Sequence, residues 1–266
     1  MKSLRELTPA KLQDVRILLS DIDDTITSEG QLEAHAYSAL HRLKQAGFIV
    51  IPVTGRPAGW CDHIARMWPV DGVIGENGAF YFVYDRARKK MRQVFWTDDD
   101  AMRRNRARLD ALGSEILEAI PGCALASDQP YRLADLAVDF CEDVPPLAEH
   151  DVERIVAQFE KAGATAKVSS IHVNGWFGDY DKLTMTRRML ADEYSLDEAQ
   201  SARSVIFAGD SPNDAPMFGA FDLSVGVANV RDMLHRIASP PAYVTTHHSG
   251  KGFSELADHI LAARGA

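Results

Sequence analysis

The sequence contains few cysteines and no long hydrophobic run, and both absences exclude whole classes of protein. Three of its 266 residues are cysteine, none of them in a CxxC pair, and an odd number makes a poor disulfide framework. We therefore expect reduced thiols and a cytoplasmic location. Nowhere do about 18 apolar residues run together to span a membrane, and the apolar stretch near the start is too short for a signal peptide. The sequence predicts no membrane partner.

Basic residues are also in the minority. The 29 lysines and arginines face 38 aspartates and glutamates, which leaves a net charge of -9. A general nucleic-acid binder needs a positive surface, so we expect no nucleic-acid partner. The same charge does not argue against an anionic small substrate, because the local field of a site can oppose the global sign. No GxGxxG follows the first predicted strand, which disfavours a dinucleotide-binding enzyme.

The first and last thirds of the chain alternate between apolar runs and helical patterns. The expected strands are residues 15–19, 48–53, 73–74, 204–208, 223–227 and 242–245, and the expected helices are 31–45, 57–67, 182–193, 212–218, 230–237 and 254–263. Strands separated by helices imply parallel pairing with right-handed crossovers. The predicted fold class is therefore α/β, with a Rossmann-like parallel-sheet core.

The middle of the chain has a different pattern. It predicts a hairpin of residues 80–84 and 93–96, a long helix from an N-cap at Thr97 to about residue 120, a strand over 134–140, a helix over 147–162 and a strand over 166–173. This is an α+β unit inserted between two α/β halves. We predict a discontinuous core of residues 1–84 and 176–266, with an inserted domain of residues 85–175.

The most informative motif is Asp-Ile-Asp-Asp-Thr at residues 21–25, directly after the first strand. Reacting groups of open α/β sheets lie where strands end. Asp21 and Asp23 can converge there, one as a nucleophile and the other as a proton shuttle. Such a pair would also bind a hard cation, Mg²⁺ above all. The alternative is an acidic turn in which Asp24 or Thr25 caps a local segment.

Three further motifs follow other strands or the insert. Thr54-Gly55-Arg56 offers a hydroxyl and a close backbone N–H to a phosphate oxygen; its alternative is a turn glycine with a solvated arginine. Lys182 opens a helix, where a lysine is unfavourable without an anion nearby; its alternative is a solvated lysine. The segment 209–214, Gly-Asp-Ser-Pro-Asn-Asp, places carboxylates at a strand end; its alternative is an aspartate N-cap with a Ser-Pro turn.

Taken together, these motifs resemble those of the haloacid dehalogenase-like (HAD) hydrolase superfamily. Its pattern of DxDxT, Thr or Ser, Lys and GDxxND is met here by Asp21, Asp23, Thr25, Thr54, Lys182, Asp210, Asn213 and Asp214. The position of the insert, and the Gly-Glu-Asn-Gly-Ala at residues 75–79, resemble the type-IIB capped subgroup with its Cof-type sugar phosphatases and phosphomannomutases. One departure is Leu183, where many members have glycine after the lysine.

The resemblance implies a role for each motif residue. Asp21 would attack phosphorus, and Asp23 would protonate the leaving alcohol and then activate water. The implied Mg²⁺ ligands are the carboxylates of Asp21 and Asp210 and the backbone carbonyl of Asp23, with Asp214 in support. The implied phosphate-binding residues are Thr54, Gly55, Lys182 and Asn213.

The function so implied is that of a Mg²⁺-dependent phosphatase. It would hydrolyse a small phosphorylated metabolite, with sugar phosphates favoured, through an aspartyl-phosphate. The first alternative is a phosphomutase of the same superfamily, which would share every motif. A phospho-acceptor signalling protein and a non-enzymatic phosphate-binding protein fit less well, because neither needs the full motif set. The sequence does not indicate an oligomeric state.

Overall fold

A parallel sheet forms the centre of the molecule in the computed structural model, which describes residues 1–265. Its strand order is β1-β13-β12-β11-β2-β3, and every neighbouring pair is parallel. The strands are β1 (Lys2–Ser3), β2 (Ile17–Ser20), β3 (Ile49–Pro52), β11 (Val205–Gly209), β12 (Ser224–Gly226) and β13 (Tyr243–Val244). The prediction of an α/β fold with a Rossmann-like parallel core is confirmed.

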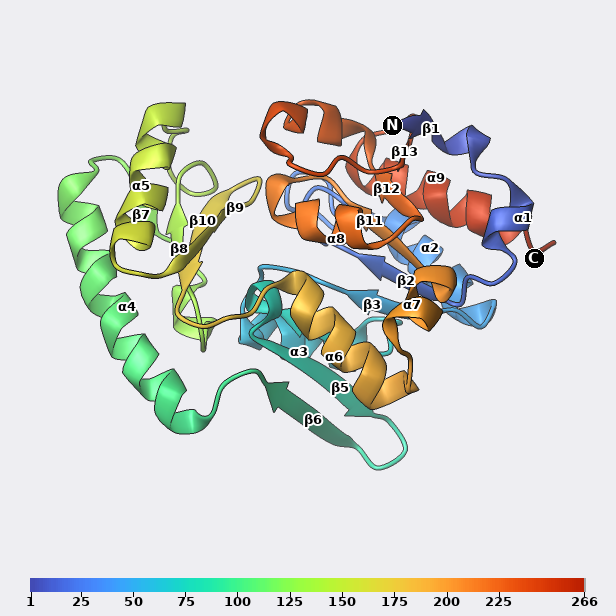
Figure 1. Cartoon of the computed structure of the whole chain (residues 1–266), viewed down its shortest axis with the longest axis horizontal. Helices are drawn as coiled ribbons and strands as arrows, with labels where there is room; N and C mark the ends of the chain where they lie inside the picture. The colour runs from blue at the N-terminus through green and yellow to red at the C-terminus, as the bar shows by residue number, and fades with distance from the viewer. Residues whose placement is uncertain (266) are drawn as a thin grey trace.

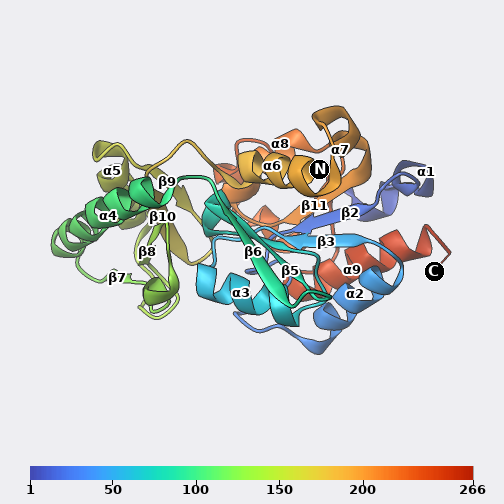
Figure 2. The ribbon, with the colours of Figure 1, turned by 90° about the horizontal axis from the view of Figure 1, so that it is seen from below.

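Helices cover both faces of this sheet, so its strands are buried on both sides (Figure 2). Helices α2, α3 and α9 lie on one face, and α6, α7 and α8 on the other. The side chains of β2 alternate accordingly: Leu18 joins the core under α2, α3 and α9, whereas Ile17 and Leu19 join the core under α6 and α8. The core helices are α1 (Pro9–Leu12), α2 (Ala34–Gln45), α3 (Ala58–Met67), α6 (Lys182–Tyr194), α7 (Glu198–Ser204), α8 (Ala215–Ala220) and α9 (Ser249–Ala262).

A second, antiparallel sheet extends the first beyond β3. It consists of β4 (Val73–Gly75), β5 (Phe80–Asp85) and β6 (Lys90–Phe95), and a parallel bridge from Val53 to Ile74 joins it to the main sheet. The predicted boundary between residues 84 and 85 falls inside this β5–β6 hairpin, and the boundary between 175 and 176 falls inside β10 (His172–Trp176). The proposed division into core and insert therefore stays a prediction at the level of single residues.

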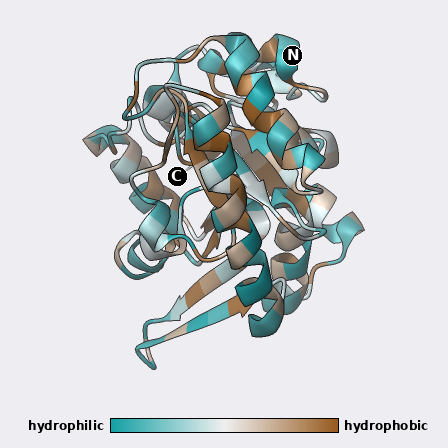
Figure 3. Ribbon diagram, turned by 90° about the vertical axis from the view of Figure 1, so that its left-hand side faces the viewer, coloured by the Kyte–Doolittle hydropathy of each residue, from teal (hydrophilic) through white to brown (hydrophobic). Residues whose placement is uncertain are grey.

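The inserted unit has a sheet and a hydrophobic core of its own (Figure 1). Its sheet order is β7-β8-β10-β9, and helices α4 and α5 pack on the side that faces away from the parallel sheet. The elements are α4 (Asp99–Ala119), β7 (Ala124–Leu125), β8 (Leu136–Asp139), α5 (Glu149–Lys161), β9 (Thr165–Val168) and β10. Below we call this unit the cap. Coloured by hydropathy, the ribbon is brown along the central strands and mostly teal on the outer helices (Figure 3).

Several local predictions were wrong. The single strand expected over 166–173 is the hairpin of β9 and β10, because Ser169 turns the chain with its hydroxyl oxygen accepting from the N–H of His172. Asp98, not Thr97, caps α4, since its carboxylate accepts from the N–H of Ala101 at 2.7 Å. The helix expected over 230–237 is a pair of 3-10 turns. Among residues 1–265, no helix has the length and apolar character needed to cross a bilayer.

Candidate active site

The carboxyl ends of three neighbouring strands carry the motif residues. Asp21 follows β2, Asp210 follows β11 on one side of it, and Thr54 follows β3 on the other side. Parallel strands end at the same edge, so residues far apart in sequence meet there. The N–H of Asp21 donates to the carbonyl of Ala208 at 2.9 Å, which extends the pairing of β2 and β11 up to the site.

Three buried carboxylates form the centre of this edge. Asp21, Asp210 and Asp214 each offer an oxygen, and these atoms lie within 4.8 Å of one another. Only 5%, 3% and 0% of these residues, respectively, is exposed. The backbone fixes Asp214, whose Oδ2 accepts from the N–H groups of Asp210 and Ser211 at 3.0 and 3.2 Å. Converging oxygen ligands of this kind can hold a divalent cation.

Lys182 places its ammonium group among these carboxylates. Its Nζ donates to Oδ1 of Asp21 at 2.9 Å and to Oδ1 of Asp214 at 2.7 Å, and the residue is 1% exposed. Burial by itself would lower the pKa of Lys182, but the two carboxylates raise it above its ordinary value. The interpretation of Lys182 as a solvated lysine is therefore wrong: it is the first residue of α6 and points into the site.

The cluster holds more negative charge than Lys182 neutralises. Burial, followed by repulsion from Asp214 and Asp23, raises the pKa of Asp21 to about 8 despite Lys182. Burial and the neighbouring carboxylates also raise the pKa of Asp210 well above its usual range. Raised carboxylate pKa values report a shortage of positive charge. The donor set therefore fits a hard divalent cation in both charge and chemistry.

Two residues to which the sequence analysis gave no role hold Asp210 in place. The hydroxyl of Thr25 donates to Oδ1 of Asp210 at 3.1 Å, and Nδ2 of Asn229 donates to its Oδ2 at 3.1 Å. The same Asn229 amide donates to the carbonyl of Asp24 at 3.0 Å. Thr25 belongs to the first motif, whereas no local signal marks Asn229, because the contact depends on how η5 (Ala228–Arg231) packs.

The predicted phosphate-binding residues lie beside this cluster. The buried Oγ1 of Thr54 accepts from the N–H of Arg56 at 3.0 Å. Nδ2 of Asn213 donates to Oδ1 of Asn77 at 3.2 Å, while Nδ2 of Asn77 is buried with no hydrogen-bond partner. A Cβ atom at Gly55 would lie 3.1 Å from that same nitrogen. Asn77, which the sequence interpretation did not select, thus presents an unsatisfied donor next to Gly55.

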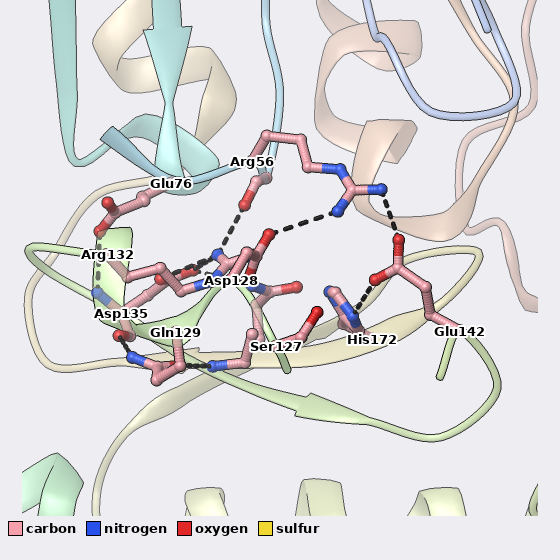
Figure 4. A network of polar contacts seen from close by, with 12 residues as sticks. Arg56, Glu76, Ser127, Asp128, Gln129, Arg132, Asp135, Glu142 and His172 are labelled. Carbon is pink, nitrogen blue, oxygen red and sulfur yellow. Dashed lines mark hydrogen bonds and ion pairs between the residues drawn. The ribbon is translucent and has the colours of Figure 1, made fainter. Parts of the chain in front are cut away.

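Asp23 lies apart from the three clustered carboxylates. Its Oδ1 and Oδ2 accept from Nε of Arg56 at 3.0 and 3.1 Å. Arg56 is 4% exposed and makes two more ion pairs, with Asp128 and Glu142 of the cap (Figure 4). The interpretation of Arg56 as a solvated arginine is therefore wrong. Two of its three partners come from the inserted unit, so no pattern around residue 56 indicates them.

The cap turns a polar sheet face toward the core. Val173 of β10 packs into the cap core, whereas its neighbours His172 and Asn174 line a cavity together with Asp21 and Asp23. This cavity is about 10 Å³ in volume, roughly the space of one water molecule. A second cavity of about 280 Å³ adjoins it and is lined by Asp23, Arg56 and Glu142 among others, so the cap lies close against the site but leaves space beside Asp23.

Gly78 links the η2 turn (Glu76–Gly78) to the start of α6. Its φ is +106°, and a Cβ atom there would lie 2.1 Å from the carbonyl oxygen of Asp181, next to Lys182. We expect Gly78→Ala to destabilise the protein by more than about 1 kcal/mol. Gly163→Ala is the matched control, since Gly163 has a φ of +77° with nothing within 4 Å of the added atom. Urea unfolding of both variants measures the difference, and equal losses would contradict the role given to the contact.

Comparisons with known proteins concern the family and the fold. Residues 18–101 match the family model described as haloacid dehalogenase-like hydrolase. A comparison with curated proteins finds no significant match. Among solved structures, a protein of Thermoplasma acidophilum aligns with a TM-score of 0.69 and 18% identity, over 92% of this chain and 98% of that one.

Two structures with stated activities share the fold as well. The sucrose-phosphatase of Synechocystis, in complex with sucrose and phosphate, has a TM-score of 0.63 and 15% identity, over 93% of this chain and 98% of its own. A HAD subclass IIB sugar phosphatase has a TM-score of 0.63 and 13% identity, over 92% and 99%. At these identities the likeness concerns the fold. The first motif lies within the region that matches this family model, residues 18–101, and the chain as a whole shares the fold of these phosphatase structures.

Proposed function

We propose that this protein is a Mg²⁺-dependent phosphatase that hydrolyses a small phosphate monoester, with sugar phosphates as the favoured class. The observation that carries the proposal is the position of Asp21. It stands at the end of β2, shares Lys182 with Asp214, and lines a cavity beneath a polar cap. The sugar-phosphatase titles of structures with the same fold support the substrate class.

The proposed reaction has two steps. In the first, an oxygen of Asp21 attacks phosphorus, the ester P–O bond breaks, and the leaving alcohol takes a proton from Asp23. In the second, Asp23 takes a proton from water, the water oxygen attacks phosphorus, and the bond to Asp21 breaks. The products are the alcohol and inorganic phosphate, and both aspartates return to their starting states.

Electrostatics provide most of the stabilisation that this reaction needs. The transferring phosphoryl group carries spread negative charge, so fixed positive charge and N–H donors lower its barrier. Lys182, the amide of Gly55 and the side chains of Thr54 and Asn213 would supply these contacts. Asp21, Asp210 and the backbone carbonyl of Asp23 would hold Mg²⁺, supported by Asp214. When bound, that ion would neutralise charge between the nucleophile and the phosphate.

A phosphate-release screen across phosphorylated metabolites tests the proposal, with Mg²⁺ present and after chelation. We expect release of inorganic phosphate with Mg²⁺ and its loss after chelation. Bound Mg²⁺ should also raise the unfolding temperature, because the three carboxylates converge only in the folded chain. Full activity without metal would contradict the proposed site. Interconversion of phosphate positions with little phosphate released would instead indicate a mutase.

A further inference from the structure

Arg56 connects the proposed acid of the core with two acids of the cap. Its Nε faces both carboxylate oxygens of Asp23, its Nη1 lies 3.3 Å from Oδ2 of Asp128, and its Nη2 lies 2.8 Å from Oε1 of Glu142. The Arg56 side chain is 5% exposed, and the ring of Trp60 lies 4.4 Å from the centre of its guanidinium. The planar guanidinium of this buried arginine therefore binds three carboxylates at once, one in the core and two in the cap.

The cap holds Glu142 firmly. Asp139, which is 1% exposed, accepts from the N–H groups of Cys141, Glu142 and Asp143 at 2.7–2.9 Å. Nε2 of His172 lies 2.8 Å from the other Glu142 oxygen. Contacts with His172 and Arg56 lower the pKa of Glu142 to about 2, so this side chain is an anion at neutral pH.

Neighbouring residues also hold Asp128, the other cap partner of Arg56, in place. Arg132, fully buried in its side chain, donates to both oxygens of Asp128 at 3.0 and 3.2 Å and to Asp135 at 3.0 Å. It also donates to the carbonyl of Gly55 at 2.7 Å. Figure 4 shows these groups around the Arg56 guanidinium, with Glu142 and His172 on one side and Asp128 and Arg132 on the other.

These contacts form only when the cap is closed. Asp128 and Glu142 lie in the cap, whereas Asp23 and Arg56 lie in the core, so these contacts need the two units to lie as close as they do in this structure. In the open state Arg56 would keep Asp23 but lose both cap carboxylates. The guanidinium would then be held only by Asp23 and by its stacking on Trp60. With fewer partners its orientation, and that of the bound carboxylate, would be less restricted.

We infer that Arg56 is a positioning residue that orients Asp23 for protonating the leaving alcohol, and that closure of the cap sets this orientation through Glu142 and Asp128. The inference rests on the proposed function, because it assigns the proton transfer to Asp23. It adds a link between closing the cap and completing the catalytic geometry. Such a link restricts hydrolysis to ligands that allow closure.

The choice of leaving group provides the test. An alkyl oxygen needs a proton to depart, whereas a nitrophenyl oxygen departs without one, so only the alkyl ester depends on the orientation of Asp23. The quantity to measure is kcat/KM, which reports steps up to the departure of the alcohol. The substrates are the best alkyl phosphate from the metabolite screen and p-nitrophenyl phosphate.

We expect Arg56→Lys to lower kcat/KM for the alkyl phosphate on the order of 10²-fold, because a lysine keeps the charge but cannot divide a planar fork among three partners. Glu142→Gln should lower it on the order of 10-fold, although Glu142 contacts Arg56 and His172 and reaches Asp23 only through Arg56. For nitrophenyl phosphate both changes should stay within about 3-fold. Arg66→Lys and Glu160→Gln, at exposed positions, are the matched controls.

Equal losses with both substrates would overturn the inference and indicate a structural role for Arg56. An unchanged alkyl phosphatase activity in Glu142→Gln would overturn the link to the cap. Thermal unfolding of each variant shows whether the fold is retained. The proposed function fails separately, if the unmodified protein releases phosphate from neither substrate.

Discussion

Asp21→Asn is expected to reduce phosphate release by on the order of 10⁴-fold or more, while the protein stays folded. A carboxamide has the shape of the carboxylate but cannot attack phosphorus to form the covalent intermediate. The substitution also removes one negative charge from a cluster of three buried carboxylates. Its oxygen can still accept the hydrogen bond that Lys182 now donates to Asp21. The fold should therefore lose no stability in metal-free buffer.

Two measurements on the same preparation check this prediction. Phosphate release reports the chemistry, and thermal unfolding reports the fold. A fully active Asp21→Asn protein would exclude Asp21 as the nucleophile. A protein that loses activity and also unfolds at a much lower temperature would leave the loss attributable to structure, and would contradict the stability expected here.

Lys182→Met should destabilise the folded protein by about 3–5 kcal/mol and also abolish hydrolysis. Methionine fills a similar volume, but it leaves the carboxylates of Asp21 and Asp214 without the ammonium group that lies 2.9 and 2.7 Å from them. Removing one partner of a buried ion pair leaves an uncompensated buried charge, which is the costly case. Urea unfolding at pH 9, where Asp21 with its pKa of about 8 is ionised, measures the effect without metal.

Three comparisons refine this second prediction. Lys161→Met, at an exposed position on α5, should change stability by less than about 0.5 kcal/mol. Asp21→Asn combined with Lys182→Met should recover part of the loss, because one of the unpaired charges is gone. Added Mg²⁺ should stabilise Lys182→Met by supplying a positive charge in its place. A loss below about 1 kcal/mol in Lys182→Met would contradict the role assigned to the ion pair.

Much of the core fold could be predicted because its signals are local. Apolar runs marked β2, β3 and β11, and the structure places these strands within about two residues of the predictions. Prediction was weaker where tertiary contacts decide the conformation. Apolar and polar residues alternate through much of residues 166–173, which predicts a single strand. Only pairing with β8 and a turn at Ser169 divides this segment into β9 and β10. The short strand β1 exists because it pairs with β13.

The residues of the candidate site also fall into a group that the sequence predicted and a group that it did not. The motif aspartates, Thr54 and Lys182 were selected because chemistry requires those residue types after strands or at a helix start. Asn77, Asn229 and Arg56 were not selected, since each becomes part of the site through a partner distant in sequence. For Arg56 the nearest such partner is 33 residues away and the farthest is 86.

The sequence by itself determined the α/β class, the order of the motifs and the presence of an insert between them. These depend on hydrophobic periodicity and on residue type, which can be read along the chain. Only the tertiary structure decided that Arg56 is buried between core and cap, and that the cap presents polar residues to the site. These features depend on which side chains of the core and the cap meet. Neither the few cysteines nor the scattered charges of the sequence indicate those contacts.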